Sequence, residues 1–261
     1  MRVALGQLGG TADPEANLAL VEKEVGRAAE VSARLLVLPE ATMCRFGVPL
    51  APVAEPLDGP WASRVRALAA GAGLTVVAGM FRPAPGGRVY NTVLVAAEDG
   101  RLAHYDKIHL YDAFGHRESD TVAPGDRPLT VEVAGVRIGV ATCYDIRFPG
   151  LFTELAARGA QVTVVPASWG AGPGKREQWE LLARARALDS TGFVVAVGQA
   201  APPEAEPSPA PTGIGGSLAV SPLGEVLTRL GPAPTFTVVD LDLGEVTRAR
   251  SAVPVLANRR W

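Results

Sequence analysis

The sequence is poor in the residues that build metal sites and disulfide frameworks. Its only cysteines are Cys44 and Cys143, and its three histidines (His104, His109 and His116) lack the spacing of a zinc site. Neither cysteine belongs to a CxxC pair. We therefore expect no metal and reduced thiols.

Charge of one sign is not in excess. The 25 Lys and Arg residues are balanced by 27 Asp and Glu residues, which gives a formal net charge of −2. A chain without a basic surface has no electrostatic footprint for nucleic acid or anionic lipid. We expect neither as a partner.

Long hydrophobic runs are also absent. No segment approaches the roughly 20 apolar residues that a membrane helix requires. The apolar run at the N-terminus is too short for the core of a signal peptide, and acidic residues follow it at once. These absences predict a soluble, cytoplasmic protein.

Several common site motifs are missing too. The sequence contains no Walker loop, no GxGxxG fingerprint and no GxSxG elbow. The sequence therefore gives no indication of a nucleotide-binding loop or of a nucleophilic serine in a GxSxG elbow.

What the sequence does contain is a series of short apolar runs that alternate with segments of helical period. The runs are continuous rather than alternating, which is typical of strands that are covered on both faces. Strands followed by helices predict an α/β protein, and no linker divides residues 1–261, so we expect a single domain. Helices are expected at 14–31, 60–72, 149–158 and 176–190, with a short one near 244–250, and strands at 3–8, 34–40, 74–81, 91–97, 136–145, 161–169, 193–200, 217–221 and 236–243.

The same order of segments occurs twice. Each half reads strand, helix, strand, helix and strand, and then a hairpin that turns at Asp99-Gly100 or at Leu223-Gly224. Two similar halves give two sheets, each with an apolar face that needs a partner. We therefore expect a four-layer α-β-β-α sandwich. The Pro-rich stretch 201–213 is expected to form an exposed loop.

Three polar residues follow apolar runs, where α/β proteins build their sites. Cys143 lies between a predicted strand and a helix, where backbone N–H groups favour a thiolate, although its position fits a buried structural cysteine equally well. Glu40 ends the run RLLVLPE, either at the rim of a cleft or where the strand reaches solvent. Lys107 lies among aromatic residues in HYDKIHLYDAFG, where an ammonium could stabilise an oxyanion, and Glu118 follows it closely.

Together these segments resemble the nitrilase superfamily of carbon–nitrogen hydrolases. Glu40 in LPE, Lys107 in YDKIHL and Cys143 in CYDIRFP are similar in order and spacing to the Glu-Lys-Cys triad of that family. The resemblance runs from Met1 to about Arg260 and is nearest to the Nit-type amidases, which include omega-amidase and deaminated glutathione amidase.

The resemblance implies the carbon–nitrogen hydrolase fold, a cytoplasmic homodimer or higher homo-oligomer, and no cofactor. It also implies a cysteine hydrolase that releases ammonia from a small amide through a thioester. In this reading Glu40 is the base and Cys143 the nucleophile, Lys107 and the backbone N–H of Tyr144 hold the oxyanion, and Glu118 supports them.

The substrate is less closely defined. Arg147, four residues past Cys143, is a candidate to hold a substrate carboxylate, and a structural ion pair with Asp145 or Glu154 is the alternative. An N-carbamoyl compound or a nitrile is an alternative substrate, and a non-enzymatic binding protein is the rival from another class. The predicted pocket walls are aromatic residues that would otherwise belong to the core: Phe46, Tyr111, Phe114 and Trp169.

Overall fold

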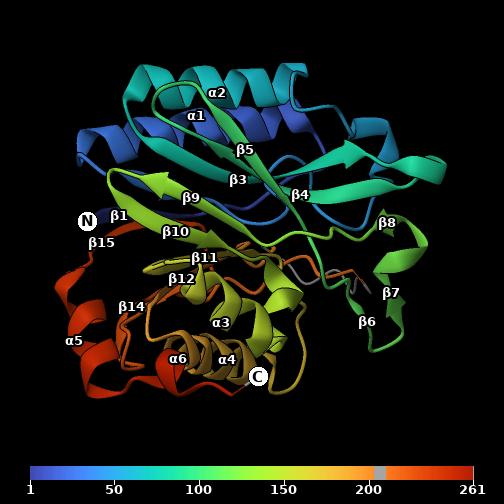
Figure 1. The fold of residues 1–261 in the computed structure, drawn as a ribbon. Helices are drawn as coiled ribbons and strands as arrows, with labels where there is room; N and C mark the ends of the chain where they lie inside the picture. Colours follow the sequence, from blue (N-terminus) through green and yellow to red (C-terminus); the bar gives the residue numbers. More distant parts are fainter. Residues whose placement is uncertain (203–209, 261) are drawn as a thin grey trace.

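Four layers make up the structure, a computed structural model that describes residues 1–202 and 210–260. Helices α1 (Pro14–Glu30) and α2 (Pro60–Ala72) cover one sheet, and α3 (Pro149–Ala157) and α4 (Lys175–Ser190) cover the other (Figure 1). The predicted α-β-β-α sandwich is therefore confirmed.

The first sheet has the strand order β15-β1-β2-β3-β4-β5, and the short β8 lies beside β4. Strands β1, β2 and β3 are parallel, and β4, β5 and β15 join antiparallel. Their bounds are β1 (Arg2–Gln7), β2 (Leu35–Val37), β3 (Thr75–Pro83), β4 (Val89–Ala96), β5 (Leu102–Asp106), β8 (Val122–Ala123) and β15 (Thr235–Asp240).

The second sheet repeats this plan with the order β14-β13-β12-β11-β10-β9. Its strands β10, β11 and β12 are parallel, and each half of the chain follows the same sequence of elements, from β1 to β5 and from β10 to β14. The bounds are β9 (Leu129–Val133), β10 (Val136–Val140), β11 (Val162–Ala167), β12 (Phe193–Gly198), β13 (Leu218–Val220) and β14 (Val226–Arg229).

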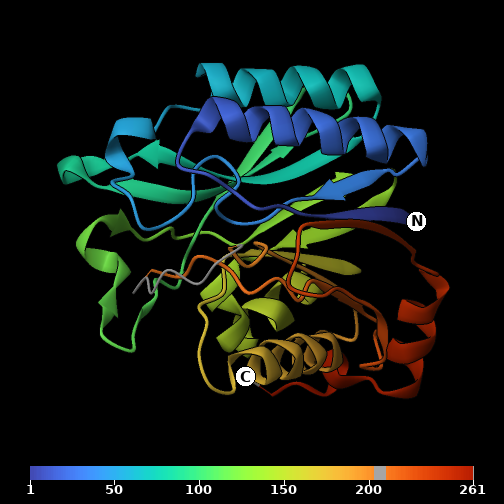
Figure 2. The ribbon, with the colours of Figure 1, turned by 180° about the vertical axis from the view of Figure 1, so that it is seen from behind.

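Smaller elements complete the chain. A hairpin of β6 (Asp112–Ala113) and β7 (His116–Arg117) projects from one side, and α5 (Gly244–Ala252) and α6 (Val255–Asn258) end the described chain (Figures 1 and 2). Short 3-10 helices are η1 (Ala51–Val53), η2 (Pro85–Gly87), η3 (Glu118–Asp120) and η4 (Cys143–Arg147). Within the described part of the chain, no helix is long and apolar enough to cross a bilayer. Residues 203–209 of the stretch predicted as an exposed loop lie outside the described residues.

The alternation of side chains along the strands explains why the apolar runs are continuous. In β1, Val3 and Leu5 pack between the two sheets with Val195 of β12, whereas Ala4 faces the outer helices and packs with Val21 of α1. Because both faces of the sheet are covered, both sets of side chains are apolar.

Glycine at one position lets β3 approach the turn that follows β2. A Cβ atom on Gly79 would lie 1.4 Å from the carbonyl oxygen of Glu40. The backbones also bond here, because the Gly79 N–H donates to the Pro39 carbonyl at 3.0 Å and the Met43 N–H donates to the Gly79 carbonyl at 3.0 Å. The turn that carries Glu40 therefore depends on the absence of a side chain in β3.

Gly79→Ala should consequently destabilise the protein by at least about 2 kcal/mol, because backbone cannot yield as a flexible side chain would. Gly71→Ala is the matched control, since nothing lies within 4 Å of its Cβ position and alanine favours its helix by about 0.5–1 kcal/mol. Urea unfolding of the two variants measures the difference. Equal midpoints would contradict the close packing of β3 against the Glu40 turn.

Candidate active site

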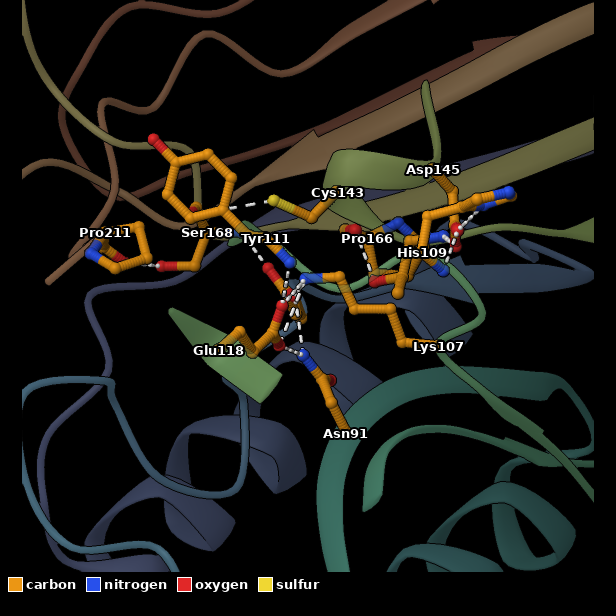
Figure 3. Close-up of polar contacts among 12 residues, drawn as sticks. Asn91, Lys107, His109, Tyr111, Glu118, Cys143, Asp145, Pro166, Ser168 and Pro211 are labelled. Atoms are coloured by element: carbon orange, nitrogen blue, oxygen red, sulfur yellow. Dashed lines mark hydrogen bonds and ion pairs between the residues drawn. The ribbon is translucent and has the colours of Figure 1, made fainter. Parts of the chain in front are cut away.

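A buried ammonium lies between two buried carboxylates. The Lys107 Nζ atom is 2.9 Å from Oε1 of Glu40 and 2.9 Å from Oε2 of Glu118, and all three side chains are buried. Figure 3 shows the Lys107 amino group and Glu118 pointing toward one another, with the sulfur of Cys143 nearby. The structure thus brings together four residues that are widely separated in the sequence.

The ends of strands from both sheets supply these residues. Glu40 lies in the turn after β2, and Lys107 directly follows β5 of the same sheet. Cys143 lies three residues beyond β10 of the second sheet, at the start of η4. The site therefore lies where the two sheets face each other, and it requires both halves of the chain.

Two residues that the sequence reasoning missed fix the position of Glu40. The side-chain amide of Asn91 donates to Oε1 of Glu40 at 2.8 Å and to Oε1 of Glu118 at 3.0 Å, and the backbone N–H of Ser168 donates to Oε2 of Glu40 at 2.8 Å. Asn91 is a polar residue at the start of the apolar run 91–97, and this position could have marked it as a candidate site residue. A backbone donor such as that of Ser168 leaves no signal in the residue types.

The cluster keeps its charges despite burial. Burial by itself would lower the pKa of Lys107, but Glu118 and Glu40 outweigh it and raise that pKa well above its usual value. For Glu118, burial opposes ionisation, yet Lys107, Asn91 and the backbone N–H of Tyr111 together lower its pKa. Lys107 is therefore an ammonium and Glu118 a carboxylate at neutral pH.

The surroundings of Cys143 oppose the thiolate that its position in the sequence favours. Burial and the negative charge of Glu40 raise the pKa of the Cys143 thiol well above its usual value, and the opposing effect of Lys107 is smaller. The helix predicted at 149–158 begins at Pro149 as expected, and the 3-10 turn η4 separates it from the strand. These surroundings favour the protonated thiol over the thiolate.

The backbone at Cys143 is held in an uncommon conformation. Its φ angle of 45° lies in the left-handed region, which is unfavourable for a residue with a side chain. The sulfur lies 3.9 Å from the carbonyl oxygen of Ser168. Strained backbone of this kind is typical of functional sites, where the surrounding structure holds it in place.

The carboxylate of Asp145 connects the turn of Cys143 with the segment of Lys107. It accepts hydrogen bonds from the Tyr105 hydroxyl at 2.7 Å, from the backbone N–H of His109 at 3.1 Å and from the backbone N–H of Thr142 at 2.9 Å. The Nδ1 atom of His109 also lies 2.7 Å from it. Tyr105 and His109 flank Lys107 in the sequence, so Asp145 fixes the two segments relative to each other.

The charged cluster of Glu40, Lys107 and Glu118 and the thiol of Cys143 line one cavity. Of the predicted pocket residues, Phe46, Tyr111 and Trp169 line it, and so does Tyr144. Phe114 does not: its side chain is 75% exposed at the tip of the β6–β7 hairpin, so its prediction as a pocket wall is wrong.

Arg147 also lines the cavity, and neither of the ion pairs considered for it forms. Its guanidinium donates to Oε1 of Gln178 at 2.8 Å and lies 5.2 Å from the ring centroid of Trp169. Glu154 instead pairs with Arg158. In residues 1–202 and 210–260, no group of three or more His, Cys, Asp or Glu side chains is arranged to hold a metal ion.

Chemically, the cavity combines a thiol, a carboxylate that can accept its proton, and an ammonium that can stabilise negative charge on a substrate oxygen.

Known proteins with the same sequence pattern are hydrolases. The sequence matches the carbon-nitrogen hydrolase family over residues 2–251. It is 59% identical over 268 residues to a Mycobacterium tuberculosis protein named only as a hydrolase, covering 99% of this chain and 95% of that protein.

Two further relatives are named as amidases. The deaminated glutathione amidase of Escherichia coli O157:H7 is 36% identical, covering 100% of this chain and 98% of that protein. Solved structures of an amidase of the nitrilase superfamily from Nesterenkonia sp. AN1 match with a TM-score of 0.82 at 28% identity, covering 100% of this chain and 94% of that chain. One of them, a glutamate-to-glutamine mutant, carries an acetamide moiety covalently added at the active-site cysteine. On this sequence and fold agreement, the chain belongs to the carbon-nitrogen hydrolase family of the nitrilase superfamily and is an enzyme of the amidase type.

Proposed function

We propose that this enzyme hydrolyses a small linear amide that bears a carboxylate, and that it releases ammonia through a thioester on Cys143. The observation that carries the proposal is the buried contact of Lys107 with Glu40 and Glu118 in the cavity that holds the thiol. An ion-pair cluster without access to solvent is costly to build as a mere structural device, and here it lines a cavity with a nucleophile.

In the first half of the reaction, Glu40 takes the proton of the Cys143 thiol and the sulfur attacks the amide carbon. The carbonyl oxygen gains negative charge, which the Lys107 ammonium and the backbone N–H of Tyr144 stabilise. Glu40 then returns the proton to the amide nitrogen, the carbon–nitrogen bond breaks and ammonia leaves. The product is an acyl group in thioester linkage to Cys143.

In the second half, a water molecule attacks the thioester. Glu40 accepts the water proton, the carbon–sulfur bond breaks, and the thiol recovers its proton as the carboxylic acid leaves. Glu118 does not reach the reacting atoms in this scheme. It holds Lys107 in position and, with Asn91, keeps the ammonium between two acceptors.

The proposed substrate class rests on Arg147. Its guanidinium faces the cavity without an acidic partner in the described residues, and a guanidinium grips a carboxylate through paired hydrogen bonds. The leading candidates are therefore monoamides of small dicarboxylic acids, including 2-oxo acids. An N-carbamoyl compound or a nitrile is the alternative within the same chemistry.

Ammonia release from a panel of compounds tests the proposal. We expect turnover of succinamate or 2-oxoglutaramate, weaker turnover of neutral amides of the same length, and poor turnover of nitriles and N-carbamoyl compounds. Cys143→Ala should lower the rate by at least roughly 10⁴-fold, because the nucleophile is lost, while it costs only about 1 kcal/mol of stability.

Cys44→Ala is the matched control, since Cys44 is the other buried free cysteine and does not line the cavity. Its rate should stay within a factor of about two of the parent rate. Substantial activity in Cys143→Ala would remove Cys143 as the nucleophile, and preference for nitriles would overturn the amide assignment.

The charged partners of the thiol should act as a unit. Glu40→Gln keeps the shape but loses the base, and Lys107→Met keeps the bulk but loses the oxyanion donor, so each should lower the rate by at least roughly 10²-fold. The double variant should be far less impaired than the product of the two single losses, because both groups serve the same step. Simple multiplication of the two losses in steady-state rates would show that they act independently.

A further inference from the structure

The charged side chains that line the cavity form two separate groups. Among its Asp, Glu, Lys and Arg side chains, the inner group is Glu40, Lys107 and Glu118, and the outer group is Arg147 and Lys175. The inner group contains two carboxylates and one ammonium, which are paired with one another. The outer group contains two cations, and in the described part of the chain neither forms an ion pair with a carboxylate.

Lysine is rare in this protein, and its placement is uneven. Among the 25 basic residues only three are lysines: Lys23, Lys107 and Lys175. Two of the three line the cavity, whereas Lys23 is exposed on α1. Lys175 is therefore not one of many solvent-exposed surface lysines.

Aromatic rings hold the Lys175 ammonium in place without neutralising it. Its Nζ atom lies 3.5 Å from the ring centroid of Phe114 and 5.9 Å from that of Tyr111. Phe114 occupies the tip of the β6–β7 hairpin with a φ angle of 54°, an unfavourable conformation for a residue with a side chain. A cation held on a ring face keeps its N–H donors free for an anion.

Lys175 is also close enough to Arg147 and Cys143 to feel their charges. Partial burial lowers the pKa of Lys175, Arg147 lowers it further, and a thiolate at Cys143 would raise it. Arg147 is oriented by a hydrogen bond to Gln178, which lies one helical turn after Lys175 on α4. The Nε atom of Arg147 is buried without a hydrogen-bond partner. Two like charges held side by side repel each other unless an anion lies between them.

We propose that Lys175 and Arg147 together bind one carboxylate of the substrate, which makes Lys175 a specificity-determining residue. The inference rests on the proposed function, because it assigns the anchor of an anionic amide. Summed over these two groups, three cations face two carboxylates, so a single carboxylate neutralises the lined cavity. The inner group is left to act on the amide at the other end of the substrate.

Steady-state kinetics with succinamate and with butyramide, a neutral amide of the same chain length, test the proposal. Lys175→Met should raise KM for succinamate roughly tenfold and leave kcat unchanged, because a charge-assisted hydrogen bond is lost from binding. The kinetic constants for butyramide should not change. Lys175→Arg should retain most of the preference for succinamate, and Lys23→Met, the matched control, should match the parent enzyme.

The outcomes separate this inference from the proposed function. If the parent enzyme prefers succinamate and Arg147→Ala abolishes that preference while Lys175→Met leaves it intact, the substrate class stands and the role of Lys175 is wrong. If Lys175→Met impairs both amides alike, Lys175 only supports the hairpin, and the inference is again wrong. A parent enzyme that prefers butyramide would overturn the proposed substrate class itself.

Discussion

The structure depends on one buried charge and the groups that compensate it. Lys107 has almost no contact with solvent, and an ammonium in such a place is tolerable only with close acceptors. Glu40 and Glu118 provide them, and Asn91 and the backbone of Ser168 satisfy the remaining oxygens. Because these groups come from both sheets, the packing of the two sheets against each other also determines the geometry of the site.

The same cluster determines what the thiol can do. The negative charge that holds Lys107 also raises the pKa of the Cys143 thiol and so opposes its ionisation. In the proposed mechanism, reactivity depends instead on the transfer of the thiol proton to Glu40 at the moment of attack. The paired inner charges and the two outer cations lie in the same cavity, and this difference between its two groups is the basis for proposing an amide with a distant carboxylate as substrate.

Patterns within short stretches predicted much of this molecule. Continuous apolar runs and the repeated order of segments predicted both sheets and their covering helices, and apolar runs that end in polar residues pointed to Glu40 and Cys143. One local strand was missed: β9 alternates at Leu129, Val131 and Val133 and pairs with the adjacent β10. Long-range pairing was beyond reach, because nothing in 236–243 indicated that this strand pairs with β1. The protonation of Cys143 follows from burial and from Glu40, neither of which is visible in the local sequence. The homo-oligomeric state and the cytoplasmic location remain predictions.

The pKa of the Cys143 thiol in Glu40→Gln tests most directly the claim that Glu40 acts on this sulfur. Ultraviolet absorbance of the thiolate, followed against pH in a Cys44→Ala background, reports on the one remaining cysteine. Removing the negative charge should stabilise the thiolate, so the pKa should fall below that of the parent protein. An unchanged or higher pKa would mean that Glu40 does not face the thiol, and the proposed base would be wrong.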